Sequence, residues 1–147
     1  MDGDKLVIEL EGTNLGLDTK AVAGIVELEK VPLMPGQSGF IAGIISFRNE
    51  PVTVIDVRKA FRSPAQAGGR HKVVVVRDKN RLLGLDAGPS VISFLWEDEI
   101  KALSPARGDG EYTKETIELE GRIVGMIDCA ALFEEASRIL STEVTGV

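Results

Sequence analysis

Short segments in which hydrophobic and polar residues alternate follow one another along the chain, which predicts a protein made mostly of β-strands. The segments with this alternation, or with many β-branched residues, are residues 5–11, 15–18, 22–28, 43–47, 51–55, 72–77, 81–86, 90–95, 115–120 and 122–127. An apolar stripe with helical spacing occurs only near the end and includes Leu132, Phe133, Ala136, Ile139 and Leu140. We therefore expect five strands in each half, a helical turn or two over residues 57–62, and a longer C-terminal helix.

The second half of the chain repeats the first. Residues 15–18 (LGLD) recur as residues 83–86, and residues 52–61 resemble residues 124–133, at offsets of 68 and 72 positions. Two copies of a unit of about 70 residues are too few for a solenoid, so they predict two similar subdomains that share one core. Short strands at this spacing favour small closed barrels over an open parallel sheet.

The linker-like stretch SPAQAGGR separates the two copies. The predicted organisation is one domain over residues 1–147, with subdomain 1 at about 5–62, a linker at 63–70 and subdomain 2 at about 71–141. Asn49 and Gly121 occupy the same position in the two copies, at the tips of predicted hairpins. Both residue types tolerate a positive φ, so we expect the same tight turn twice.

Composition excludes several classes of protein. The 147 residues carry a formal charge of −6, whereas nonspecific nucleic-acid binding needs a basic surface. No apolar run approaches the ~18 residues that a membrane span needs, and the acidic start does not resemble a signal peptide. The single cysteine excludes an internal disulfide and fits a reducing compartment. We expect a cytoplasmic protein without membrane insertion.

Four aspartates recur in pairs, Asp18 with Asp86 and Asp56 with Asp128. Two carboxylates in different environments could serve acid–base catalysis, so an enzyme using Asp18 and Asp86 is one hypothesis. Capping and turn roles are the favoured interpretation, because Asp56 and Asp128 each precede a helical segment and the other two end strands.

The remaining candidate groups do not assemble a reactive site in the sequence. His71, the only histidine, lies beside the linker with no evident partner, so neither a zinc site nor a Ser-His-Asp arrangement is indicated. Cys129 at the helix start is interpreted as a small core residue. Trp96, in a solvated loop over residues 96–100, either covers the core edge, which is the favoured interpretation, or anchors a partner. Gly68 and Gly69 belong to the linker and form no phosphate-binding loop. We expect no catalytic residue, no cofactor and no metal, and a protein that works by presenting surfaces.

The segment over residues 34–61 resembles the signature region of CheW-like coupling proteins. In that family a proline-containing loop and an aromatic residue precede a Gly-Val-x-Asn-Leu-Arg-Gly strand and turn, followed by a Pro-Val-x-Asp-Leu-Arg strand. This chain matches Gly43, Arg48, Val54, Asp56 and Arg58, with Phe40 ahead of them. Residues 6–26, 82–86 and 122–133 resemble the rest of the family pattern, so the resemblance covers nearly the whole chain.

The resemblance implies an all-β fold with minor α content: two five-stranded Src-homology-3-like barrels related by a pseudo-twofold, with a C-terminal helix. It also implies a non-enzymatic adaptor that couples the cytoplasmic tip of chemoreceptors to the regulatory domain of a CheA-type histidine kinase. A stand-alone small-ligand or regulatory module without catalytic activity is the alternative, and would show a concave polar pocket.

The same resemblance assigns the partner-binding residues. They are Val22, Gly24 and Ile25 beside the receptor groove, and Gly43, Phe47, Arg48 and Asn49 in the signature strand and turn. The chain departs from the family at three places. Gly24 stands where many members carry a glutamate, Asn49 replaces the glycine after the arginine, and Gly88-Pro89 replaces an aspartate. These departures concern the identity of the partners more than the fold.

Overall fold

The computed structural model of the chain describes residues 4–32, 39–63, 69–95, 100–104, 112–119 and 121–145. The strands are β1 (Lys5–Leu10), β2 (Thr13–Asp18), β3 (Val22–Leu28), β4 (Ile41–Phe47), β5 (Glu50–Asp56), β6 (His71–Asp78), β7 (Arg81–Asp86), β8 (Val91–Leu95), β9 (Ile100–Ser104), β10 (Thr113–Leu119) and β11 (Arg122–Ile127). A single 3₁₀ turn, η1 (Thr19–Ala21), and two helices, α1 (Val57–Ala60) and α2 (Cys129–Thr145), complete the described elements. All ten predicted strands are present, and so are both predicted helices.

One strand was not predicted. The sequence interpretation assigned residues 96–100 to a loop, but Ile100 begins β9, which pairs with β10 at the edge of a sheet. Its sequence, IKALS, is short and follows an acidic run, so the alternation signal is weak. Trp96 lies outside the described residues, as do Gly68 and residues 64–68 of the predicted linker.

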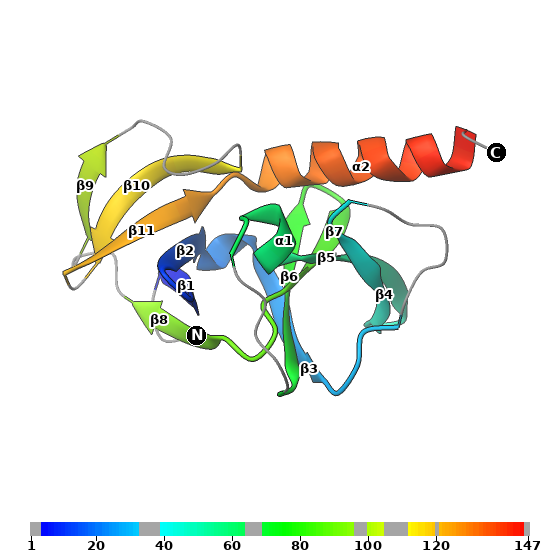
Figure 1. Cartoon of the computed structure of the whole chain (residues 1–147), viewed down its shortest axis with the longest axis horizontal. Helices are drawn as coiled ribbons and strands as arrows, with labels where there is room; N and C mark the ends of the chain where they lie inside the picture. The colour runs from blue at the N-terminus through cyan, green and yellow to red at the C-terminus, as the bar shows by residue number, and fades with distance from the viewer. Residues whose placement is uncertain are drawn as a thin grey trace.

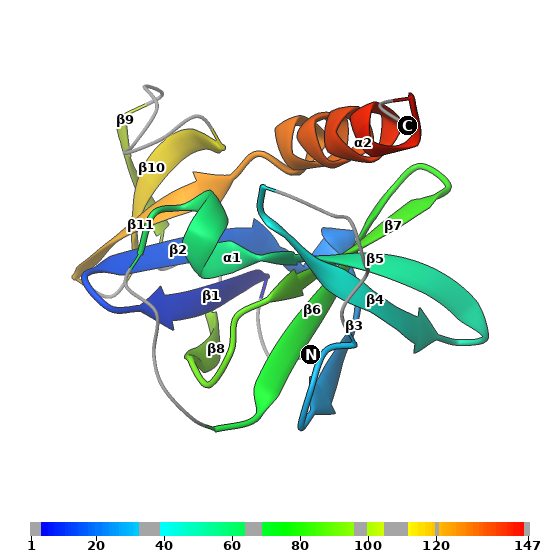
Figure 2. The same ribbon diagram turned by 45° about the vertical axis from the view of Figure 1, so that its right-hand side comes forward.

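The strands form two sheets (Figures 1 and 2). One has six strands in the order β8-β1-β2-β11-β10-β9, and the other has five in the order β3-β6-β7-β5-β4. Each strand of the five-stranded sheet has a counterpart in the other copy of the repeat. Replacing each strand by its counterpart gives the order β8-β1-β2-β11-β10, which is the six-stranded order without β9. The predicted pair of five-stranded barrels related by a pseudo-twofold is therefore confirmed, with β9 as an addition to one of them.

The sheets do not follow the two halves of the sequence. β1 and β2 pair with strands of the second copy, and β6 and β7 pair with strands of the first. The ranges 5–62 and 71–141 therefore mark the duplication in the sequence, whereas each barrel takes strands from both copies. A hairpin cannot satisfy both of its edges alone, and here both edges of the β1–β2 hairpin and both edges of the β6–β7 hairpin pair with strands of the other copy.

The repeated glycine lies at the parallel contact between strands of the two copies in each sheet. Gly16 pairs with Met126 in the parallel β2–β11 contact, and Gly84 pairs with Val54 in the equivalent β7–β5 contact. A Cβ atom on Gly16 would lie 2.7 Å from Met126 Sδ, and one on Gly84 would lie 2.9 Å from Val73 Cγ1. Both positions therefore need glycine because neighbouring side chains fill the space where a methyl group would sit.

The hydrophobic core has three parts. Ile45, Phe47, Val52, Val54, Val73 and Val75 fill the five-stranded barrel, and Val7, Ile117, Val124 and Met126 fill the other. The largest cluster lies between the sheets and includes Leu6, Leu17, Val74, Leu85 and Leu132. Alternating side chains of β1 and β6 thus point into a barrel on one face and into the shared cluster on the other. The predicted common core is confirmed.

The two helices differ although the chain enters them in the same way. The Asp56 N–H donates to Phe40 O at 2.8 Å, and the Asp128 N–H donates to Tyr112 O at 2.7 Å. α1 then ends after Ala60, and Arg62 takes a φ of 56°, whereas α2 continues to Thr145. Figures 1 and 2 show α1 between the sheets and α2 along the β7 side of the five-stranded barrel.

Among the residues that the structure describes, no helix has the length and apolar character needed to cross a membrane.

Candidate functional site

The turn between β4 and β5 is the centre of the predicted interaction surface. Arg48 and Asn49 have φ values of 50° and 66°, which is the pattern of a two-residue type I′ hairpin turn. Gly121, at the equivalent position in the second copy, has a φ of 78°. The expectation of a positive φ at Asn49 and Gly121 is confirmed. The turn leaves both the Arg48 and the Asn49 side chains exposed.

Arg48 is held in place rather than free in solvent. Its Nη2 donates a hydrogen bond to Ala23 O at 3.2 Å, and its Cζ lies 4.8 Å from the centre of the Phe47 ring. Both contacts are made at the protein surface, where a cation–π contact contributes about 0.5–1 kcal/mol. The guanidinium therefore joins the β4–β5 turn to β3, the opposite edge of the same sheet.

Gly24 and Phe47 form the inner side of this junction. Phe47 is 8% exposed, and its ring atoms lie 2.9–3.0 Å from the position that a Gly24 Cβ would take. Gly24 therefore lets the ring fill the barrel where β3 meets β4. The glutamate that many family members carry at this position does not fit beside the ring unless the ring moves.

The other predicted partner-binding residues fall into two groups. Ile25 is 41% exposed and presents an apolar side chain on β3, two residues after Ala23, whose carbonyl accepts from Arg48. Val22 is 8% exposed and belongs to the cluster between the sheets, so its side chain is mainly structural. Gly43 is buried, and a Cβ there would overlap the carbonyl oxygen of Pro32. Glycine at position 43 lets the Pro32 backbone pack directly against β4, where the Ile44 N–H donates to Pro32 O at 3.1 Å.

Two further exposed apolar residues were not predicted. Val91 on β8 is 56% exposed, and Ile123 on β11 is 63% exposed. Ile123 alternates with Val124, which is buried inside the barrel. The alternation along residues 122–127 could therefore have identified Ile123 as an outward-facing residue. Val91 lies on the strand that corresponds to β3 under the pseudo-twofold.

Three of the four repeated aspartates have the predicted capping or turn roles. Asp56 Oδ1 accepts from the Arg58 and Lys59 N–H groups at 3.0 and 3.3 Å, and Asp128 Oδ1 accepts from Ala131 N–H at 3.1 Å. Asp86 Oδ1 accepts from Gly88 N–H at 2.8 Å. The prediction is wrong for Asp18, which makes no capping bond to η1.

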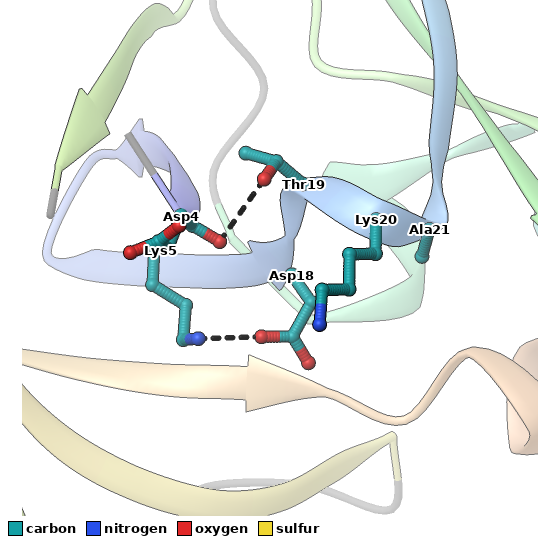
Figure 3. A pocket seen from close by; sticks show the side chains of 6 residues that line it. All are labelled: Asp4, Lys5, Asp18, Thr19, Lys20 and Ala21. Carbon is teal, nitrogen blue, oxygen red and sulfur yellow. Dashed lines mark hydrogen bonds and ion pairs between the residues drawn. The ribbon is translucent and has the colours of Figure 1, made fainter. Parts of the chain in front are cut away.

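Asp18 pairs instead with Lys5, its partner in the β1–β2 register. The Lys5 Nζ atom lies 2.6 Å from Asp18 Oδ1. The two residues line a hollow of about 470 Å³ together with Asp4, Thr19, Lys20 and Ala21 (Figure 3). Thr19 Oγ1 donates to Asp4 O at 3.2 Å and holds the entry to η1 against β1 (Figure 3).

The prediction that His71 lacks a partner is wrong. His71 begins β6, and its Nδ1 lies 2.8 Å from Oδ2 of Asp86 at the end of β7. The β6–β7 ladder brings them together, since the Ala87 N–H donates to Lys72 O at 2.9 Å. The Asp86 side chain is 8% exposed and that of His71 is 36% exposed. This buried carboxylate and imidazole line a second hollow of about 350 Å³ with Asp56, Lys30 and Lys59.

Cys129 is not an activated nucleophile. Burial raises the pKa of its thiol from 9.0 to about 11, while Lys114 lowers it and Asp128 raises it further by smaller amounts. A thiolate is therefore disfavoured at neutral pH. Its interpretation as a core-packing residue is supported by its contact with the cluster between the sheets. In the part of the chain that the structure describes, no three His, Cys, Asp or Glu residues are grouped to hold a metal ion.

Comparison with known proteins agrees with this fold. The family model for the CheW-like domain matches residues 4–137. The chain is similar to the chemotaxis protein CheW of Bacillus subtilis (strain 168), with 25% identity over 141 residues that cover 92% of this chain and 90% of that protein.

Its fold is similar to the crystal structure of the scaffolding protein TtCheW from Thermoanaerobacter tengcongensis. The TM-score is 0.69 at 21% identity, covering 85% of this chain and 88% of that one. The family model spans most of the sequence, including both copies of the repeat and the signature turn at Arg48. The chain therefore belongs to the CheW-like domain family.

Proposed function

We propose that this protein is a cytoplasmic, non-enzymatic adaptor that couples the cytoplasmic tip of chemoreceptors to the regulatory domain of a CheA-type histidine kinase in chemotaxis or a related motility system. The observation that carries the proposal is the family match over residues 4–137. The similarity to a curated chemotaxis protein over 92% of the chain supports it. Protein coupling of this kind needs matched surfaces and no chemistry at the adaptor.

The β3 edge and the β4–β5 turn supply a surface suited to a helical partner. Ile25 offers an exposed apolar side chain on β3, and Arg48 offers a cation that is hydrogen-bonded to the same strand at Ala23 O. An amphipathic helix that presents an apolar residue and a carboxylate could use both. The remaining predicted residues support this surface by shaping β3 and β4 without presenting large exposed groups. They are Val22, Gly24, Gly43 and Phe47.

The departures from the family pattern are compatible with this surface. Gly24 removes a charged contact but gives the Phe47 ring its place. Asn49 keeps the left-handed turn, because asparagine adopts positive φ more easily than most residues. At Gly88, with a φ of 61°, the Arg58 guanidinium occupies the space of a side chain, so an aspartate there would overlap it.

Binding of a receptor-tip peptide hairpin and of the kinase regulatory domain tests the proposal. Ile25→Glu places a charge on the exposed apolar position, and we expect receptor-tip affinity to fall by about tenfold or more, the loss of one apolar anchor. Ile123→Glu is the matched control, because Ile123 is also exposed but lies on the other sheet. Calorimetry should show nearly unchanged receptor-tip affinity for the control.

Two results would contradict the proposal. The first is a wild-type protein that binds neither the receptor tip nor the kinase domain at micromolar concentrations. The second is an equal loss of receptor-tip binding in Ile25→Glu and Ile123→Glu, which would show that β3 has no special role. Circular dichroism melts of both variants establish that each is folded at the temperature of the binding experiment.

A further inference from the structure

The hollow beside His71 lies at one end of the five-stranded barrel, where every strand of that sheet begins or ends. β5 and β7 end there, β4 and β6 begin there, and the chain leaves β3 beside them. The described lining residues are Lys30, Val31, Ile41, Ala42, Asp56, Lys59, His71 and Asp86. The volume is about 350 Å³, and the mouth of a β-barrel is a common place for a small-molecule site of this size.

One part of this lining is apolar. Ile41 is 7% exposed, and Val31 and Ala42 pack against the cluster that fills the barrel. These side chains belong to β4 and to the segment that follows β3. The hollow therefore offers an apolar surface to an aliphatic group as well as charged groups.

The charged part of the lining carries both signs, and the two signs do not pair with each other. Lys30 and Lys59 are exposed, and neither forms an ion pair within the part of the chain that the structure describes. Asp56 Oδ1 accepts from two backbone amides at the start of α1, and no described ion pair involves this carboxylate. With Asp86 the lysines and aspartates balance, so the hollow suits a ligand without net charge that carries both signs.

His71 supplies a hydrogen-bond acceptor in its neutral form. Its Nδ1 lies 2.8 Å from Asp86 Oδ2, and a carboxylate only accepts hydrogen bonds, so Nδ1 carries the proton of this contact. Nε2 of the neutral ring then keeps its lone pair. A ligand ammonium group can donate to this nitrogen, and no second proton on the ring is required.

The hollow beside Asp18 provides an internal comparison. Asp18 occupies the position of Asp86 in the repeat, but its carboxylate already pairs with the Lys5 ammonium at 2.6 Å. The lining there has no large apolar side chain among the described residues; it consists of Asp4, Lys5, Asp18, Thr19, Lys20 and Ala21. Of the two hollows, only the one beside His71 combines an apolar wall with lysines and an aspartate that do not pair with each other.

We propose that the hollow beside His71 binds the zwitterion of a free α-amino acid with an apolar side chain. The ammonium group of the ligand would donate to Asp56 and to His71 Nε2, and its carboxylate would accept from Lys30 and Lys59. These are charge-assisted hydrogen bonds at both ends of the ligand, while its aliphatic group lies against Ile41. The proposal goes beyond the adaptor function and does not depend on it, because it requires no partner protein.

L-Leucine and two analogues that each lack one charge test the proposal. The full chain is titrated at neutral pH while the ring resonances of His71, the only histidine, are followed by NMR. We expect a saturable shift with L-leucine. Isocaproate lacks the ammonium group and isoamylamine lacks the carboxylate, so each should bind at least about tenfold more weakly. No saturable shift, or equal affinity for either analogue, would overturn the proposal.

A pair of cap-preserving variants tests the ammonium end. Asp56→Asn and Asp128→Asn each remove one negative charge at a helix start, and asparagine caps a helix about as well as aspartate. Only Asp56 lines the hollow. We expect Asp56→Asn to weaken L-leucine binding by about fivefold or more and Asp128→Asn to leave it unchanged. Equal effects in the two variants would contradict the proposed site.

A second pair of variants tests the carboxylate end. Lys59→Met and Lys20→Met each remove one positive charge, but Lys20 lines the other hollow. We expect only Lys59→Met to weaken L-leucine binding, again by about fivefold or more. The same loss in Lys20→Met would indicate general electrostatic attraction and would count against a site.

Glycine tests the apolar wall, because it has the same two charges as L-leucine and no side chain. Burial of the isobutyl group should make L-leucine bind at least about tenfold more tightly than glycine, measured in the same titration. Equal affinities would show that Ile41 and its neighbours do not contact the ligand, and would overturn the assignment to an apolar amino acid.

Discussion

The two copies of the repeat share a backbone plan but place different chemistry on it. Gly16 and Gly84 occupy equivalent parallel contacts, and Asp56 and Asp128 begin their helices with equivalent backbone bonds and each accept from the amide three residues further on. At the strand ends the copies diverge, since Asp18 pairs with Lys5 and Asp86 pairs with His71. The difference shows that duplication retained what the barrels need for closure, while the residues around each strand end were free to change.

The two helices also start alike but differ in the residues that follow. Phe61 follows α1 and packs at a ring distance of 6.1 Å from Tyr112, whereas Phe133 lies inside α2 and is 4% exposed. Arg81 covers the Phe133 ring, with its Cζ 4.7 Å from the ring centre. The second copy therefore seals the shared core with a helix, and the first copy leaves its phenylalanine partly exposed.

Removing these two phenylalanines should give the largest contrast. Phe133→Ala deletes a buried ring from the core and should lower the free energy of unfolding by about 3–5 kcal/mol. Phe61→Ala should cost roughly half as much, because part of its ring is already in contact with solvent. Urea denaturation measures both, and equal losses would show that α2 adds nothing to the core beyond what α1 provides.

Gly43 and Glu115 occupy the same register position in the two copies, opposite Val54 and Met126. Gly43→Ala should destabilise the protein by about 2–3 kcal/mol, because the new methyl group overlaps a backbone oxygen that cannot rotate away. Glu115→Ala should change stability by less than about 0.5 kcal/mol, since Glu115 is exposed. Thermal melts that place both variants within a degree of the wild type would contradict this asymmetry.

The aspartates at the strand ends should also differ in stability. Asp86→Ala removes a buried carboxylate that accepts from Gly88 N–H and His71, so we expect a loss of about 1–3 kcal/mol. Asp18→Ala removes a half-exposed ion pair and should cost about 1 kcal/mol or less. Chemical denaturation at neutral pH tests the order, and a larger loss for Asp18→Ala would reverse the comparison.

Cys129 corresponds to Val57 of the first copy, and its titration should produce a smaller, pH-dependent difference. The thiol ionises near pH 9.0 when unfolded and near 11 in the fold, because burial disfavours the thiolate. Stability is therefore fully present below pH 9 and is lost as the pH rises toward 11, by about 2 kcal/mol. Cys129→Val should remove this part of the alkaline loss, which denaturation at pH 8 and pH 10.5 measures against the wild type.

Local patterns in the sequence were enough to predict ten of the eleven described strands, the hairpin turns at Asn49 and Gly121, and the helix starts. Asn49 and Gly121 marked the hairpin tips because few residue types accept a positive φ, and Asp56 and Asp128 marked the helix starts because free amides need an acceptor. The repeat itself predicted two related barrels with a common core. For the site, the resemblance named Arg48 and Ile25, whose side chains are exposed.

Only the tertiary structure decided how these elements combine. The exchange of strands between copies, the His71–Asp86 pair and the packing of Gly43 against Pro32 all join residues that local periodicity treats separately. Strand alternation specifies which face of a strand is apolar, but it carries no information on which edge that strand will pair with. The sequence by itself therefore determined the elements and their duplication, and the long-range pairing of edges determined which residues share a barrel, a turn or a hollow.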